Sequence, residues 1–239
     1  RQIVEMWLWI EVAMLFGSGI LGIGHHYFWI GTPEYWWEIG ALFSALEPVP
    51  LIAMFVHVVY DWGKETGIKE GEGHSDAKVM NNSPAFAWFV TNAFGNFLGA
   101  GVWGFFHTLP QVNIYTHGTQ FTSAHGHLAF FGAYATILIG MFYMGVQGKN
   151  GIKVMKATFD SKMAIFLITF GVLGMTVSLT VAGYGQVLVE RAQMGATWEG
   201  FFVSQDMVWF VQGLGWRLAT GIMTFVGFIY LVKDLLTTS

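Results

Sequence analysis

The sequence contains no cysteine among its 239 residues. This absence excludes zinc sites with cysteine ligands, iron–sulfur clusters and blue-copper centres, because all of them need a thiolate ligand. Any metal in this protein must therefore be bound by His, Glu, Asp or Met side chains. Without thiols, the sequence also gives no indication of the redox compartment.

Charged residues are scarce. They make up 11% of the chain, whereas a soluble domain carries about 25%. Hydrophobic residues make up 54%, and 22 Phe and 11 Trp suit contact with lipid and packing around flat cofactors. This composition predicts an integral membrane protein surrounded by lipid, with no nucleic-acid partner.

The first residues, Arg1-Gln2-Ile3, lack an initiator Met, a charged leader region and a signal cleavage pattern. We therefore expect the sequence to begin in the middle of a longer protein, just before a membrane span.

Six segments reach the roughly 20 mainly apolar residues that a spanning helix needs. They predict an all-α fold, a polytopic transmembrane helix bundle that forms a single domain over residues 1–239. We find no internal repeat and no low-complexity segment. The predicted spans are about 3–30, 35–62, 84–106, 119–147, 162–189 and 204–232.

The loop cations predict the orientation. With six spans, nine Lys and Arg residues fall on one side of the membrane, and only Arg191 lies in a loop on the other side. The positive-inside rule then places both termini in the cytoplasm. The nine cations are Arg1, Lys64, Lys69, Lys78, Lys149, Lys153, Lys156, Lys162 and Lys233.

His125 and His127 are the two residues around which the prediction is built. They lie two positions apart in the apolar stretch THGTQFTSAHGHLAFF. Successive residues of an α-helix are rotated by about 100°, so positions i and i+2 point to nearly opposite faces. The pair can therefore serve one metal centre on each side of a single helix, although buried histidines without a metal remain the simpler alternative.

A second pair, His25-His26, lies near the end of the first predicted span. Imidazole binds iron, copper and zinc, and ionisable groups inside a membrane are usually functional. The orientation derived above brings His25, His26, His125 and His127 to one depth near the outer face. We expect His25 and His26 to share one metal ion, with further ligands from elsewhere.

Glu47 and Arg217 are further ionisable residues inside predicted spans. Pro48 and Pro50 kink the helix beside Glu47, which is either a neighbour of the metal site that donates protons or a protonated carboxyl bonded to freed carbonyl groups. Arg217 suits the propionates of a haem or, equally, an ion pair with Asp206.

Other ionisable residues receive no role or an undecided one. His107 and His117, at the outer loop, could meet propionates or simply lie at the interface. Side chains near the cytoplasmic ends of their spans can reach water, so no chemistry is assigned to Glu5, Glu11, His57 and Asp61.

Five motifs together resemble one family. The stretches GIGHHYFWIG, FSALEP, FLGAGVWGF, THGTQ and AHGHLAFFGAY resemble the catalytic, haem b-containing subunit of bacterial nitric oxide reductase, of the haem–copper oxidase superfamily. The resemblance covers about residues 17–145 with specific motifs and the remainder by hydropathy. It implies that the chain is the C-terminal half of a twelve-span subunit.

The resemblance also implies roles for individual residues. His125 is similar to the proximal ligand of the high-spin haem b3, and His127 to an axial ligand of the low-spin haem b. His25 and His26 are similar to two ligands of a non-haem iron, and Glu47 to the glutamate beside that iron, implicated in proton delivery. The third iron histidine and the second haem b histidine would lie upstream of Arg1.

The implied reaction reduces two NO to N2O and water with two electrons and two protons. The electrons would come from a membrane-anchored cytochrome c subunit or from quinol. The expected location is the bacterial inner membrane, with the active site toward the periplasm. Alternatives are an oxygen-reducing haem–copper oxidase, a relative that dismutates nitric oxide, and a membrane transporter that contains no haem.

Overall fold

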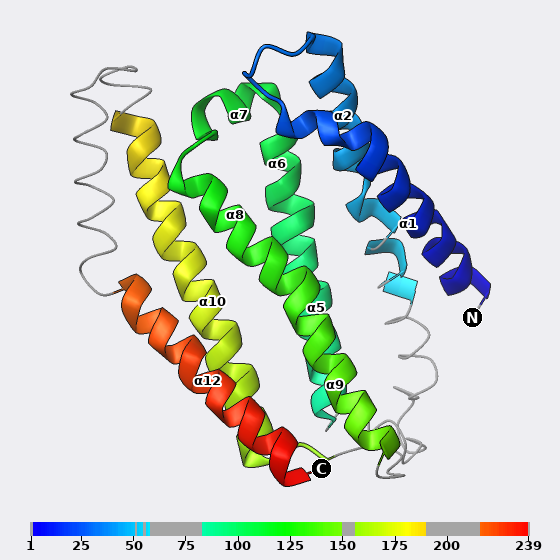
Figure 1. Cartoon of the computed structure of the whole chain (residues 1–239), viewed down its shortest axis with the longest axis vertical. Helices are drawn as coiled ribbons and strands as arrows, with labels where there is room; N and C mark the ends of the chain where they lie inside the picture. The colour runs from blue at the N-terminus through cyan, green and yellow to red at the C-terminus, as the bar shows by residue number, and fades with distance from the viewer. Residues whose placement is uncertain are drawn as a thin grey trace, which may run out of the picture.

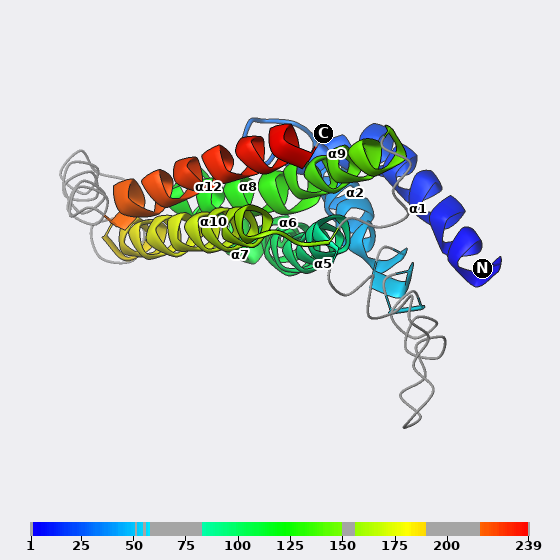
Figure 2. The ribbon, with the colours of Figure 1, turned by 90° about the horizontal axis from the view of Figure 1, so that it is seen from below.

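The computed structural model describes residues 2–50, 52–54, 56–57, 83–149, 156–189 and 216–238. These residues contain helices and connecting turns and no strand, as the all-α prediction requires. Successive long helices run alternately up and down, and they form an elongated slab (Figures 1 and 2). The short helix α7 lies at one end of the slab, beside the turn that leads into α2.

The helices are partly interrupted by tighter or wider turns. A 3-10 segment follows α1, and π-helical segments separate α5 from α6 and α8 from α9. The elements are α1 (Gln2–Leu21), the 3-10 segment (Gly22–His26), α2 (Glu34–Leu46), α5 (Pro84–Asn96), a π segment (Phe97–Trp103), α6 (Gly104–Thr108), α7 (Pro110–Thr116), α8 (Gln120–Phe130), a π segment (Phe131–Ala135), α9 (Thr136–Lys149), α10 (Phe159–Gln186) and α12 (Trp216–Thr238).

Three helices in the described part of the chain are by themselves long and apolar enough to cross a membrane: Glu34–Met54, Phe159–Val189 and Trp216–Thr237. The third and fourth predicted spans each correspond to two helices joined by a π segment. Of the sixth, residues 204–215 lie outside the described residues. The membrane character is therefore shown, whereas the count of six spans stays a prediction.

The first predicted span, 3–30, is longer than the helix found. The α-helix ends at Leu21, the 3-10 segment continues to His26, and Trp29 has a positive φ of 65° in the turn that follows. Close packing explains the change of helix type. A Cβ atom on Gly24 would lie 2.1 Å from the backbone oxygen of Trp36, so the chain here runs directly against α2.

Glycine contacts also set the distances between other helices. A Cβ on Gly95 would lie 2.7 Å from the Cα of Gly132, so the backbones of α5 and the π segment after α8 touch. Gly171 and Gly174 bring α10 against Thr220 and its neighbours on α12 in the same way. Both glycines belong to the stretch FGVLGM, and small residues of this kind allow membrane helices to pack closely.

The buried core lies toward the end of the slab where α9, α10 and α12 meet. Its centre is formed by Trp88 and Tyr143, which are fully buried, and by apolar side chains from four helices. Large apolar side chains elsewhere on α1, α10 and α12 are exposed, as expected for surfaces that face lipid or further helices. The core cluster comprises Ala85, Trp88, Ile139, Tyr143, Ala164, Ile168 and Leu231.

Candidate metal centre

The first turn of α8 fixes the position of the His-x-His sequence. Thr119 is the N-cap, and its side chain accepts a hydrogen bond from the Phe121 amide at 3.3 Å. The amide of Gln120 donates to Oε1 of Gln186, on α10, at 2.7 Å. Two of the amide groups left open at the helix start are thus bonded, one of them to a neighbouring helix.

His125 is oriented by the backbone of the π segment after α5. Its Nδ1 lies 2.9 Å from the carbonyl oxygen of Gly99. A carbonyl oxygen only accepts, so Nδ1 carries the proton, and Nε2 of the neutral ring keeps its lone pair. A histidine that binds metal usually has its second nitrogen held in this way.

The glycines around this contact allow the imidazole to approach the backbone. A Cβ on Gly99 would lie 2.7 Å from the amide nitrogen of Ala129, and one on Gly104 would lie 3.3 Å from Cε1 of His125. π-Helical turns in proteins occur frequently at functional sites. Gly99 thus both allows close packing and positions the candidate ligand.

His127 is held differently. Its Nδ1 donates to the carbonyl oxygen of Ser123, one turn earlier on the same helix, at 2.8 Å. The exposed ring lines an open, largely apolar groove of about 580 Å³ together with Ser123, Gly126 and Phe131. His125 does not line this groove. The structure therefore places the two histidines toward different spaces, as helix geometry predicts.

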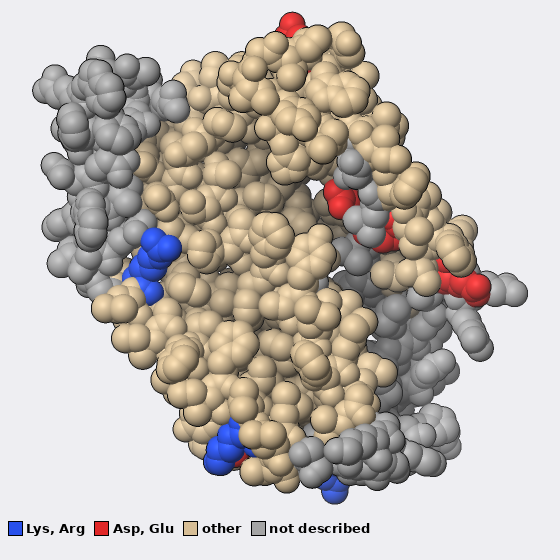
Figure 3. All heavy atoms as spheres, viewed as in Figure 1, with Lys and Arg blue, Asp and Glu red and all other residues tan. Residues whose placement is uncertain are grey.

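The other space is a cavity of about 680 Å³ between α1, α2, α6 and α8. Both volumes fall within the range of about 300–1,000 Å³ that is usual for ligand sites. In Figure 3, acidic residues are visible in a hollow on the side of α1 and α2, whereas the basic residues lie over α12 and at the lower edge. The ionisable residues lining the cavity are Glu11, His25, His26, Glu47, His107, His125 and Tyr134.

His25 and His26 lie side by side in this cavity. Their ring centroids are 4.0 Å apart, with 38° between the ring planes. The 3-10 segment is pressed against α2, since a Cβ on Gly40 would lie 2.4 Å from the amide nitrogen of His25. The rings are close enough for both to approach one ion, which is the arrangement expected from the sequence.

Glu47 lies where α2 is interrupted. The α-helix ends at Leu46, and the Glu47 amide makes a 3.3 Å bond to the carbonyl oxygen of Ser44, three residues back. Pro48, which has no amide hydrogen, also lines the cavity. The predicted break in the helix is present, and Glu47 lines the same cavity as four histidines.

His107 also belongs to this cavity, a position that the sequence left undecided. Its ring centroid is 5.0 Å from that of His125, and its Nε2 is buried. The side-chain amide of Asn113 donates to the carbonyl oxygen of His107 at 2.9 Å and accepts from Nε1 of Trp29 at 2.8 Å. Asn113 thereby ties α7 to the turn after His26.

Arg217 and His117 line neither of these two spaces. Arg217 is half-buried in the first turn of α12, and His117 is exposed after α7. Asp206, the alternative partner for Arg217, lies outside the described residues. The role of Arg217 at a propionate stays a prediction.

The residues suit a haem better than they suit a complete non-haem metal site. His125 and His127 each present one proton-free nitrogen toward a space of adequate volume. In contrast, no group of three or more His, Asp or Glu side chains in the described ranges is arranged to hold a metal ion. His25 and His26 supply two candidate ligands for such a site.

Glu11 is the residue that sequence reasoning missed. The sequence placed it near the cytoplasmic end of its span, where side chains can reach water. In the structure it lines the same cavity as the histidines, and its Oε2 atom is buried. A useful signal was available: Glu11 is flanked by apolar residues on both sides in the stretch LWIEVAML, where a carboxylate is costly.

Comparison with known proteins identifies the family of the chain. The family model described as cytochrome C and quinol oxidase polypeptide I matches residues 1–230. A nitric oxide reductase subunit of Stutzerimonas stutzeri is 34% identical over 232 residues, which cover 96% of this chain and 46% of that protein. The chain therefore spans about half the length of that relative.

A solved structure has a similar fold. A heme-copper terminal oxidase, determined as a dimer by cryo-electron microscopy, superposes with a TM-score of 0.63 over 91% of this chain and 39% of that chain. The two sequences are 17% identical, so this likeness concerns the fold alone.

Proposed function

The chain belongs to the family of cytochrome c and quinol oxidase polypeptide I, and from this premise we propose that it forms the haem-binding half of a membrane nitric oxide reductase. The proposed reaction reduces two NO to N2O and water. The observation that carries the proposal is the pair His125 and His127, which face a cavity and a groove on opposite sides of α8. The similarity to the nitric oxide reductase of Stutzerimonas stutzeri suggests the substrate.

The family implies haem cofactors, and we assign them by the donor groups present. His125 would hold the high-spin haem b3 in the cavity, and His127 the low-spin haem b in the groove. His25 and His26 would contribute two ligands to a non-haem iron. Bound there, these groups would supply the electrons and the Lewis acidity for joining two NO molecules.

The residues of this chain then have separate tasks. Gly99 and Ser123 hold the two imidazoles in one tautomer through their carbonyl oxygens. The cavity walls exclude bulk water and keep two small substrate molecules close together, which favours their reaction by proximity. Glu47, whose carboxyl group lines the cavity, would hold and donate protons.

The surroundings of the enzyme are part of the proposal. The cation distribution favours termini in the cytoplasm, and the expected membrane is the bacterial inner membrane, with the metal centre toward the periplasm. A membrane-anchored cytochrome c subunit or quinol would supply the electrons.

Two measurements on the purified holoenzyme test the function. We expect consumption of NO with formation of N2O when a reduced donor is supplied, together with two haems and one non-haem iron per molecule. Copper in place of the iron, with reduction of O2 and none of NO, would identify an oxygen-reducing oxidase. Formation of N2 and O2 from NO would identify a dismutase. A pure protein without a visible haem spectrum would favour a transporter.

A further inference from the structure

Glu11 is a carboxylate in the middle of an apolar helix. It lies in α1 (Gln2–Leu21), 14 positions before His25. At about 1.5 Å per residue, this separation is roughly 20 Å along the helix axis. The cavity lined by both residues is therefore long, and Glu11 marks the end remote from the histidines.

A second titratable residue, His57, packs against α1 one turn before Glu11. Trp7, one turn earlier on α1, stacks on the ring of His57, with ring centroids 6.5 Å apart and 24° between planes. His57 follows Glu47 along the chain, beyond the break in α2. Glu11 lines the cavity, whereas Trp7 and His57 do not, so His57 lies against α1 one turn away from Glu11 and outside the cavity lining.

A carboxylate buried in a membrane protein is costly to keep charged, which favours a group that changes its protonation state. The described residues that line the cavity with Glu11 include no Lys or Arg. Its other ionisable groups are Glu47, Tyr134 and four histidines, all of which can also gain or lose a proton. The surroundings suit a carboxyl group that takes up and releases a proton.

We infer that Glu11 is a proton-carrying residue of this enzyme, which exchanges protons with Glu47 along the cavity. The inference rests on the proposed function, because reduction of two NO to N2O and water consumes two protons with two electrons. Glu11 accepts a proton on one carboxylate oxygen and releases it toward Glu47. No bond other than the O–H bond is made or broken, and no electron moves in this step.

The main test replaces the carboxyl group without changing its size. In the holoenzyme, Glu11→Gln should lower kcat for NO by about 10- to 100-fold, at the low end of the effect of losing a positioned acid or base. The KM for NO and the haem absorption spectrum should stay unchanged, and proton uptake during one turnover should slow by the same factor as kcat. Glu11→Asp should recover part of the rate.

The matched control is Glu5→Gln, which makes the same chemical change on an exposed position of the same helix. It should leave kcat and proton uptake as in the unmodified enzyme. If Glu11→Gln reacted within about twofold of the unmodified rate, or if it lowered kcat without slowing proton uptake, Glu11 would be no proton carrier.

Infrared spectroscopy covers the case in which Glu11→Gln does not assemble. Oxidised-minus-reduced difference spectra should show a carboxyl C=O band that moves in Glu11→Asp, and an unmoved band would overturn the inference. This readout separates the two proposals. An unmodified enzyme that binds haem but does not reduce NO would refute the function, whereas the infrared band reports on Glu11 alone.

Discussion

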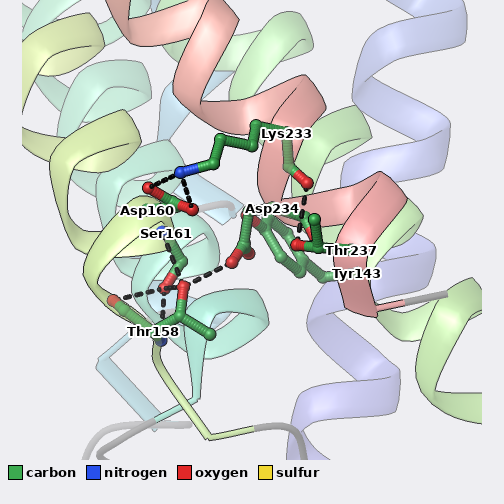
Figure 4. Close-up of polar contacts among 7 residues, drawn as sticks. All are labelled: Tyr143, Thr158, Asp160, Ser161, Lys233, Asp234 and Thr237. Atoms are coloured by element: carbon green, nitrogen blue, oxygen red, sulfur yellow. Dashed lines mark hydrogen bonds and ion pairs between the residues drawn. The ribbon is translucent and has the colours of Figure 1, made fainter.

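The two ends of the helix slab use polar residues in opposite ways. At the histidine end, imidazole and carboxyl groups line a cavity, and the ring of His127 lines a more open groove. At the end where α9, α10 and α12 meet, polar groups bond to one another across the helices (Figure 4). At the histidine end, the rings line spaces that could hold a ligand. At the other end, hydrogen bonds between side chains hold neighbouring helices together.

Asp234 is the central residue of the hydrogen-bond network where α9, α10 and α12 meet. It is 1% exposed, and its Oδ2 accepts a hydrogen bond from the Tyr143 hydroxyl at 2.8 Å. Its Oδ1 accepts a short hydrogen bond from Thr158. Thr158 is also the N-cap of α10, in a reciprocal capping box with Ser161. One carboxylate thus joins α9, the start of α10 and α12.

This comparison shows that burial of an ionisable group does not by itself indicate chemistry. Asp234 and Glu47 are both carboxylates at membrane helices, but Asp234 is surrounded by hydroxyl donors of its own chain, whereas Glu47 lines a cavity shared with histidines. Substitutions at the histidine end should therefore change spectra and rates, and substitutions at the other end should change stability.

The largest effect is expected from the two candidate haem ligands. His125→Ala should remove the high-spin haem signal and leave the low-spin signal, and His127→Ala should do the converse, because the two rings face different spaces. Both variants should lose NO reduction. Optical and electron paramagnetic resonance spectra of the purified proteins check this, with the exposed His117→Ala as control. Intact spectra in both variants would refute the assignment.

The second largest effect is expected from Glu47→Gln. The amide keeps the size of the side chain but cannot donate a carboxyl proton, so kcat should fall by about 100- to 10,000-fold while both haem signals persist. Stopped-flow measurement of NO consumption checks the rate. Glu38→Gln, an exposed change on the same helix, should react at the unmodified rate. An equal rate in both variants would remove Glu47 from the mechanism.

Asp234→Asn should affect stability and not chemistry. An amide replaces one acceptor oxygen by a donor that faces a hydroxyl group, which costs about 1–3 kcal/mol when the site is buried. We expect a lower thermal unfolding midpoint in detergent, with unchanged haem spectra and unchanged kcat. Tyr143→Phe should show a smaller decrease, and the exposed Tyr184→Phe none. A loss of kcat at full haem content would give Asp234 a role in the reaction.

Lys233→Ala should have the smallest effect. Lys233 pairs with Asp160 at 2.8 Å, but the lysine side chain is 59% exposed, and water screens such pairs. The unfolding midpoint should not differ measurably from that of the unmodified protein. A decrease as large as that in Asp234→Asn would show that this pair contributes to fastening α10 to α12.

The parts that sequence predicted well depend on local geometry. The opposite faces of His125 and His127 follow from helix rotation, and the break at Glu47 follows from the missing amide of Pro48. Hydropathy similarly predicted a helical membrane protein. Each of these properties is determined within a few residues of the chain.

The parts that sequence missed depend on tertiary packing. The end of α1 at Leu21 results from contact of Gly24 with α2, which no periodicity reveals. The carbonyl group of Gly99 holds His125 because a π segment brings it there. Glu11 lines the cavity, and α2 packs along α1. Residues 190–215, with Arg191 and Asp206, lie outside the description.

The contact between Gly95 and Gly132 limits which substitutions such a protein can tolerate. Both positions lie next to or within π segments, and neither has a side chain, yet the two backbones meet where α5 crosses the helix that carries the histidines. A single methyl group at either position would force these helices apart and shift the imidazole relative to the carbonyl that aligns it. Constraint on the candidate haem ligands therefore extends to two glycines that do not contact them. A substitution at this crossing should be tolerated only when both helices change together.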